Sequence, residues 1–77
     1  MFFAYILSCN DGTLYIGSTN NLEKRLYSHN NLKSGAHYTK IRRPVQLAYS
    51  EQFETFSEAK KREAELKTWT REKKLSL

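Results

Sequence analysis

The segments Phe2-Phe3-Ala4-Tyr5-Ile6-Leu7-Ser8 and Thr13-Leu14-Tyr15-Ile16-Gly17-Ser18 are two short apolar runs on either side of Asn10-Asp11-Gly12. Runs of this length that are rich in aromatic and aliphatic residues are typical of β-strands. The Asn-Asp-Gly segment offers the positive-φ residues that a tight hairpin needs. The pattern therefore predicts that two antiparallel strands open the fold.

A helix is predicted to follow this hairpin. Asn20 and Asn21 are good N-cap residues, because their side-chain oxygens can accept hydrogen bonds from free backbone N–H groups. Leu22 and Leu26 are four residues apart and mark the buried side of a helix that ends near Asn30.

A loop and a third strand come next. Residues 31–44 contain Gly35 and many polar residues, so they are predicted to form a loop. Val45, Leu47 and Tyr49 alternate with polar or small residues, and this alternation has the period of a strand with one apolar face.

A second helix is predicted from the spacing of Thr55 and Glu58, which is that of a capping box. Its apolar stripe consists of Phe56, Ala59 and Leu66, with Trp69 near the end. Residues 71–77 add a short helical turn. The predicted order is β-β-α-β-α, an α+β fold in which a small three-stranded antiparallel sheet is flanked by helices. Residues 1–77 are expected to form a single domain.

The cysteine content and the N-terminus indicate a cytoplasmic protein. Cys9 is the single cysteine, and no Cys/His cluster has zinc-ligand spacing, so an internal disulfide and a structural zinc site are both excluded. The apolar N-terminal run has no basic segment before it and is too short for a membrane span. We expect no signal sequence and no membrane contact.

The positive charge is concentrated in the middle of the chain. The net charge is +5, and the segment from Lys24 to Ser50 holds six basic residues and no acidic one. Such a stretch can hold phosphates, and an aromatic ring within it can stack on a base, although a solvated basic loop fits the same pattern. The residues predicted to bind nucleic acid are Lys33, Tyr38, Lys40, Arg42 and Arg43.

Glu63 breaks the apolar pattern of the second helix. It lies four residues after Ala59 and three before Leu66, on the stripe that should pack against the sheet. A buried unpaired carboxylate is disfavoured, so Glu63 must be paired, protonated, bound to a metal or open to a cleft. A structural ion pair, for example with Arg25, explains the pattern without any chemistry.

Arg25 and His29 break the pattern of the first helix in the same way, because they are stacked four residues apart at the edge of its inward face. Tyr5 and Tyr15 lie in the hairpin strands, where each taken singly suits a core position. A phenol is a poor base at neutral pH unless a nearby cation, metal or histidine assists it.

In these residues the chain resembles the GIY-YIG endonucleases. Phe3-Ala4-Tyr5 and Tyr15-Ile16-Gly17 stand where that family carries its two name-giving tripeptides. Arg25 and His29 fall where the family has an arginine and, in some members, a histidine four residues later. Glu63 matches the family's metal-binding glutamate. The resemblance covers essentially the whole chain and is greatest to the small stand-alone, single-domain (UPF0213-like) members.

The resemblance implies hydrolysis of phosphodiester bonds of DNA, including structured or single-stranded nucleic acid. The reaction would use one divalent metal, Mg²⁺ or Mn²⁺, held by Glu63. It implies that one tyrosine, Tyr5 or Tyr15, orients or deprotonates the attacking water with help from His29 or the metal. Arg25 would offset the charge that grows on the phosphate.

Departures from the family pattern keep two alternatives open. Ser18 stands where the DNA-repair branch has a lysine, and no counterpart of a late active-site asparagine follows Trp69. One alternative is a nucleic-acid-binding module with little or no cleavage. The other is a protein-interaction module in which Glu63 and Arg25 form a structural pair. In either case a protein partner can supply targeting, because the chain is too short for a separate specificity domain.

Overall fold

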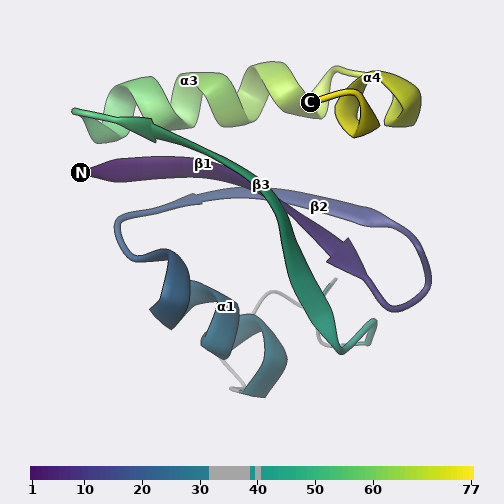
Figure 1. Cartoon of the computed structure of the whole chain (residues 1–77). Coiled ribbons are helices and arrows are strands. Elements are labelled where there is room, and N and C mark those ends of the chain that lie inside the picture. The colour runs from purple at the N-terminus through teal and green to yellow at the C-terminus, as the bar shows by residue number, and fades with distance from the viewer. Residues whose placement is uncertain (32–38, 40) are drawn as a thin grey trace.

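The computed structural model of the chain describes residues 1–31, 39 and 41–77. The described part is a three-stranded antiparallel sheet with the strand order β2-β1-β3 and helices on both of its faces (Figure 1). The elements are β1 Phe2–Cys9, β2 Leu14–Thr19, α1 Leu22–Asn31, β3 Val45–Phe53, α3 Phe56–Lys67 and α4 Arg71–Leu75. The predicted α+β class and the predicted sheet are confirmed.

The hairpin between β1 and β2 closes through Gly12. The Gly12 N–H donates to the Cys9 carbonyl at 2.9 Å, and the Cys9 N–H donates to the Thr13 carbonyl at 2.8 Å. Gly12 has a φ of 84°, and it is the only residue in the described part of the chain with a positive φ. Asn10 and Asp11 were expected to share this conformation and do not, because a three-residue hairpin loop needs one left-handed residue at its end.

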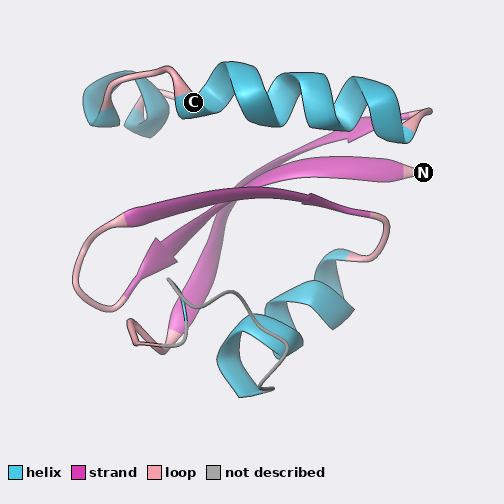
Figure 2. Ribbon diagram, turned by 180° about the vertical axis from the view of Figure 1, so that it is seen from behind, coloured by secondary structure: helices cyan, strands magenta, loops and turns pink. Residues whose placement is uncertain are grey.

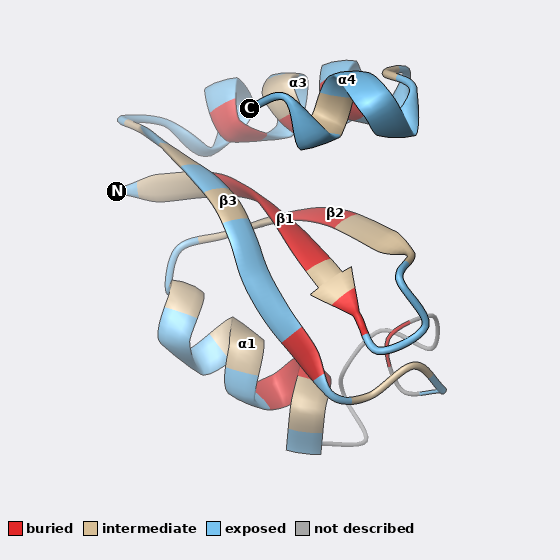
Figure 3. Ribbon diagram, turned by 45° about the vertical axis from the view of Figure 1, so that its right-hand side comes forward, coloured by how far each residue is buried: buried red, intermediate tan, exposed pale blue. Residues whose placement is uncertain are grey.

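The central strand β1 contributes to a core on each face of the sheet, with α3 above and α1 below in the view of Figure 1. Figure 2 shows the same arrangement from behind, and Figure 3 shows buried residues concentrated along β1. The core on the α3 face contains Ala4, Ile6, Ile16 and Leu66, with Leu14, Tyr49, Phe53 and Trp69 packed against it. The core on the α1 face contains Tyr5, Leu7, Cys9 and Val45, with Tyr15, Leu22 and Leu26 packed against it.

The third strand differs from its prediction. Leu7 pairs with Leu47, but the preceding residue Ile6 pairs with Tyr49, so Ala48 has no partner on β1. Such a bulge reverses the direction of the side chains that follow it. Leu47 therefore lies on the α1 face and Tyr49 on the α3 face, and the predicted single apolar face of Val45, Leu47 and Tyr49 is wrong. The strand also runs on to Phe53.

Both long helices begin where their capping residues predict. The Asn21 side-chain oxygen accepts a bond of 3.0 Å from the backbone of the first turn of α1. Thr55 and Glu58 form the reciprocal capping box of α3. Phe56 is an exception among the predicted core residues, because it is 47% exposed and its ring meets that of Phe2 at the start of the central strand β1.

None of the helices in the described ranges is both long enough and apolar enough to cross a membrane.

Candidate active site at the edge strand β2

Tyr5 lies at the centre of β1, paired with Gly17 on the edge strand β2. Its ring extends across Gly17, so that a Cβ at position 17 would stand 2.6 Å from Tyr5 Cζ and closer still to the hydroxyl oxygen. No side chain fits at that distance. Glycine at position 17 is therefore what lets the Tyr5 hydroxyl reach the edge of the sheet.

His29 holds this hydroxyl from the other side. Its imidazole is fully buried near the C-terminal end of α1, with Nε2 2.9 Å from Tyr5 Oη and Nδ1 2.7 Å from Thr39 Oγ1. Burial lowers the pKa of His29 to about 4, and the positive charges of Arg25 and Arg43 act in the same direction. The imidazole is therefore neutral at pH 7, with one nitrogen able to donate and the other able to accept.

The Tyr5 phenol is protonated at neutral pH. Burial raises its pKa, while hydrogen bonding and charge from Arg25 act against that rise. Tyr5 donates to Nε2 of His29 when the imidazole carries its proton on Nδ1 and gives it to Thr39. The ring of Tyr15 meets the His29 ring edge-on, with 5.1 Å between the centroids. The two tyrosines, His29 and Arg25 thus form one group on the α1 face.

Glu63 approaches β2 from the α3 face. Only 8% of the residue is exposed, as its position on the inward stripe predicts. Ser18 Oγ donates to Oε1 at 2.7 Å, Lys60 Nζ lies 3.3 Å from Oε1, and Lys67 Nζ lies 2.8 Å from Oε2. Burial raises the pKa of the Glu63 carboxyl, but the hydrogen bonds from Lys67, Ser18 and Lys60 outweigh that effect and hold it below its ordinary value.

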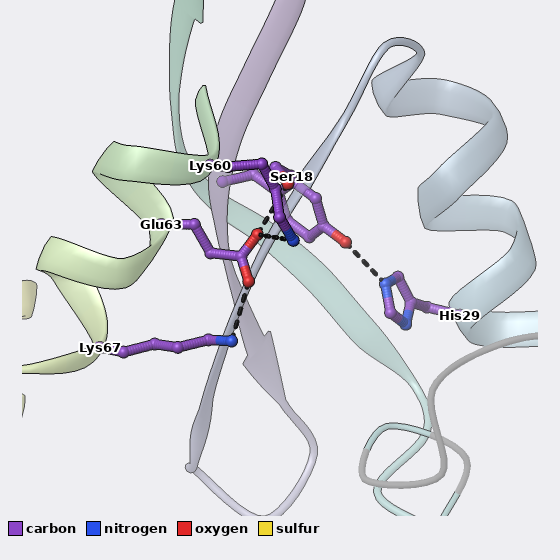
Figure 4. Close-up of polar contacts among 6 residues, drawn as sticks. Ser18, His29, Lys60, Glu63 and Lys67 are labelled. Atoms are coloured by element: carbon purple, nitrogen blue, oxygen red, sulfur yellow. Dashed lines mark hydrogen bonds and ion pairs between the residues drawn. The ribbon is translucent and has the colours of Figure 1, made fainter. Parts of the chain in front are cut away.

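The Tyr5–His29 pair and the Glu63 carboxylate come together because Gly17 and Ser18 are neighbours on the edge strand β2. Successive residues of a strand face opposite sides, so Tyr5 reaches β2 at Gly17 on one face and Glu63 reaches it at Ser18 on the other. Figure 4 shows the Glu63 carboxylate with its three donors and, across the strand, the hydrogen bond between His29 Nε2 and the Tyr5 hydroxyl. The Glu63 charge contributes to the raised pKa of Tyr5, so the two groups are within electrostatic range.

The five residues proposed from the sequence as catalytic thus come together from four elements. They are Tyr5 on β1, Tyr15 on β2, Arg25 and His29 on α1, and Glu63 on α3. Glu63 is paired with two lysines of its own helix, while Arg25 acts on Tyr5. The suggested structural pair of Glu63 with Arg25 is therefore not among the ion pairs that the structure records.

Sequence reasoning missed Lys60 and Lys67. They stand three residues before and four residues after Glu63, which are the spacings at which helical side chains meet. The signal was present in the sequence, but it is also that of ordinary surface pairs on a charged helix. Ser18 was noted only because it stands where one branch of the family has a lysine. Its hydrogen bond to Glu63 shows that it is part of the site.

The residues predicted to bind nucleic acid are only partly described. Lys33, Tyr38 and Lys40 lie outside the described residues. Arg42 forms an ion pair of 2.9 Å with Asp11 in the hairpin loop. Arg43 donates to the carbonyls of His29 at 2.6 Å and Ser28 at 3.4 Å, at the end of α1. Both guanidinium groups have contacts within the fold, and their role in nucleic-acid binding stays a prediction.

Comparison with known families matches residues 1–76 to the model of the GIY-YIG catalytic domain. The chain belongs to the GIY-YIG family. Membership suggests a nuclease-type function, because endonuclease activity occurs in the family, and it implies interaction with nucleic acid in general.

Two bacterial relatives match over nearly their whole length. The chain is 59% identical to a UPF0213 protein of Staphylococcus saprophyticus and 56% identical to one of Staphylococcus epidermidis. Each comparison covers 97% of this chain and 90% of the relative.

Two structures determined by solution NMR have a similar fold. One is a protein of E. faecalis, which matches with a TM-score of 0.64 and 46% identity over 96% of this chain and 78% of that one. The other is a UPF0213 protein of Bacillus halodurans, with a TM-score of 0.58 and 37% identity over 96% of this chain and 79% of that one.

Proposed function

We propose that this GIY-YIG chain hydrolyses phosphodiester bonds of DNA with one divalent metal, Mg²⁺ or Mn²⁺, bound at Glu63. The observation that carries the proposal is the meeting of the Tyr5–His29 pair and the Glu63 carboxylate at neighbouring positions of β2. A buried carboxylate and a buried phenol beside a neutral histidine are groups suited to metal-assisted hydrolysis. They converge at the edge strand β2, which is the side of the sheet that an extended substrate would approach.

Glu63 would offer a hard cation a single protein ligand, and the contacts of Lys60 and Lys67 with its two oxygens would have to open for the cation to bind. No cluster of three or more histidine, cysteine or acidic residues that could hold a metal is found within residues 1–31, 39 and 41–77. Mg²⁺ is commonly held by one or two carboxylates together with water and substrate phosphates. Glu63 would be that carboxylate, and the bound metal would supply Lewis-acid stabilisation of the phosphate charge.

Tyr5 is the general base that the geometry favours. Its hydroxyl oxygen would accept a proton from the attacking water while its own proton passes to Nε2 of His29. When His29 Nδ1 donates to Thr39, Nε2 is free to accept that proton. Because His29 is neutral at pH 7, Nε2 would have a lone pair for that proton, and the negative charge of a bound phosphate would favour the imidazolium that forms.

Arg25 and Tyr15 would position and stabilise the reacting phosphate. The Arg25 guanidinium acts on the Tyr5 hydroxyl, so its charge lies beside the proposed point of attack. A fixed cation at that place stabilises the negative charge that develops on the phosphate oxygens. Tyr15 lies on the same face, packed against His29, with its hydroxyl within electrostatic range of Lys67.

The direct test is a cleavage assay with purified protein. Linear, single-stranded and branched DNA, together with RNA, are incubated with Mg²⁺ or Mn²⁺ and with the Glu63→Gln, Tyr5→Phe and Glu54→Gln variants. We expect Glu63→Gln and Tyr5→Phe to lower cleavage by roughly a hundredfold or more. Glu54→Gln removes an exposed charge outside the site and should leave the rate unchanged. Cleavage that persists in Glu63→Gln would overturn the mechanism.

One observation favours a second candidate, a nucleic-acid-binding module that does not cleave. Both oxygens of Glu63 already receive donors from Ser18, Lys60 and Lys67. A protein in which these contacts persist would bind DNA through its basic surface and hold no metal. Binding that weakens steeply with salt, without cleavage under any of the conditions above, would favour this candidate.

A further inference from the structure

Two ammonium groups contact one carboxylate in the candidate site. Lys67 Nζ lies 2.8 Å from Oε2 of Glu63, and Lys60 Nζ lies 3.3 Å from Oε1. The side chains of Lys60 and Lys67 are 52% and 56% exposed, whereas that of Glu63 is 10% exposed. The lysines therefore reach in from solvent to a carboxylate that is itself fixed.

The two lysines carry more positive charge than is needed to neutralise Glu63. One lysine is enough to neutralise the carboxylate. The second lysine leaves a net positive charge around the carboxylate. A divalent cation approaching Glu63 would meet two like charges within a few ångströms. The site as it stands is better suited to an anion.

Lys60 and Lys67 share one stripe of α3 with an exposed aromatic ring. They lie two helical turns apart on one stripe of α3, about 10 Å along the axis, with Glu63 between them. The stripe continues to Phe56, whose ring is 47% exposed and lies 5.7 Å from Lys60 Nζ. An exposed ring next to a lysine suits a base stacked beside its phosphate.

We propose that Lys60 and Lys67 form a phosphate clamp that exchanges partners when substrate binds. In the free protein both ammonium groups of the clamp contact the Glu63 carboxylate. In the complex the two ammonium groups bind backbone phosphates on either side of the reacting one, and Glu63 is released for the metal. The proposal rests on the proposed function for the metal at Glu63, but the clamp's contact with nucleic acid does not depend on cleavage. It predicts that nucleic acid and metal raise each other's affinity.

The first measurement is binding of a fluorescein-labelled single-stranded DNA oligonucleotide by anisotropy, with EDTA present, between about 50 and 200 mM salt. Each lysine–phosphate contact on a single strand contributes about 0.7 to the slope of log affinity against log salt. The Lys60→Gln/Lys67→Gln variant should therefore lose about 1.4 from the slope. The matched control is Lys61→Gln/Lys74→Gln, which removes the same charge elsewhere and should lose clearly less.

The second measurement is Mn²⁺ binding followed by electron paramagnetic resonance on the protein alone. If the lysines block Glu63, removing them should tighten Mn²⁺ binding by about two- to fivefold per lysine, the size of a surface charge interaction. The control variant should bind Mn²⁺ as the wild type does, and Glu63→Gln should lose the site. Adding the unlabelled oligonucleotide should raise the Mn²⁺ affinity of the wild type more than that of the clamp variant.

The outcomes separate the clamp from the proposed nuclease. Equal salt slopes for the clamp and control variants, or weaker Mn²⁺ binding without the lysines, would overturn the clamp even if cleavage depends on Glu63. A wild type that never cleaves but shows the expected slopes would refute the nuclease and support the clamp's contact with nucleic acid. Absence of DNA binding in the wild type would overturn both.

Discussion

The ring of Tyr5 occupies the space that a side chain at position 17 would fill. A Cβ there would lie 2.6 Å from Tyr5 Cζ, which is far inside van der Waals contact. The Tyr5 ring is buried and bonded to His29, so it has little freedom to move aside. The glycine of the second tripeptide is thus required by the tyrosine of the first.

Gly17→Ala should therefore displace Tyr5 and break its bond to His29. We expect a loss of roughly 1–3 kcal/mol in the free energy of unfolding, as for other overpacked cores, and a loss of cleavage. Urea unfolding measures the first and the cleavage assay the second. A double-mutant cycle with Tyr5→Leu provides the control, because Gly17→Ala should cost less once the large ring is gone. Additive effects of the two substitutions would contradict the steric argument.

The buried imidazole of His29 predicts a pH dependence of stability. Its pKa is about 4 in the folded protein and near 6.5 in the unfolded chain, so the unfolded chain binds more protons between these values. The stabilising contribution is complete above pH 6.5 and is lost as the pH falls toward 4, by up to about 3 kcal/mol. Urea unfolding at steps between pH 7 and pH 4.5 measures this slope.

His29→Gln is the control for that slope. Glutamine keeps a polar side chain in place but does not titrate, so the loss of stability between pH 6.5 and 4.5 should become much smaller. The carboxyls with lowered pKa values, Asp11 and Glu63, lose their stabilising contributions mainly below pH 4.5 and so do not mask the effect. An unchanged slope in His29→Gln would show that the imidazole is not responsible.

Local patterns in the sequence predicted the parts of the fold that depend on local geometry. The left-handed Gly12 and the Thr55–Glu58 capping box each involve residues within a few positions of one another. The burial of Glu63 could also be predicted, because it follows from helical periodicity alone. All of these features can be predicted from residues that are close together in the sequence.

The parts that the sequence did not reveal depend on distant partners. Ala48 forms a bulge because β3 must pair with β1, and nothing near Ala48 marks the shift. Glu63 had several possible cations within reach, and only the packing of α3 against β2 decides between Arg25 and the lysines. The steric link between Tyr5 and Gly17 likewise appears only when β1 and β2 are in register.

Ser18 is expected to act as a positioning residue for Glu63. Its hydroxyl donates to Oε1 at 2.7 Å and helps to hold the pKa of the carboxyl below its ordinary value. Ser18→Ala should therefore raise the pKa of Glu63, measured by NMR of its side-chain carboxyl carbon. Cleavage should fall about tenfold, the effect of losing one hydrogen bond of about 1.4 kcal/mol to a charged group.

The matched control for Ser18→Ala is Ser50→Ala, on the exposed outer strand β3. It should leave both the pKa of Glu63 and the cleavage rate unchanged. If Ser18→Ala lowers stability but leaves the Glu63 pKa in place, the serine has a structural role only.

Asn30 connects the helix that carries Arg25 and His29 to the sheet. Its side-chain Nδ2 donates to the Val45 carbonyl at 3.0 Å, and its Oδ1 accepts from the Val45 N–H at 2.8 Å. Asn30→Ala removes both bonds and leaves the backbone N–H and carbonyl of the buried residue Val45 without them, so we expect a loss of roughly 1–3 kcal/mol in the free energy of unfolding measured with urea.

Asn31→Ala is the comparison for this variant, because Asn31 makes a single exposed bond to the carbonyl of Tyr27. Its cost should stay within about 0.5 kcal/mol. Since Asn30 fixes α1 against β3, its loss should also disturb the Tyr5–His29 bond, which the chemical shifts of the His29 ring would report. A folded Asn30→Ala protein with unchanged His29 shifts and unchanged stability would show that hydrophobic packing alone holds α1 in place.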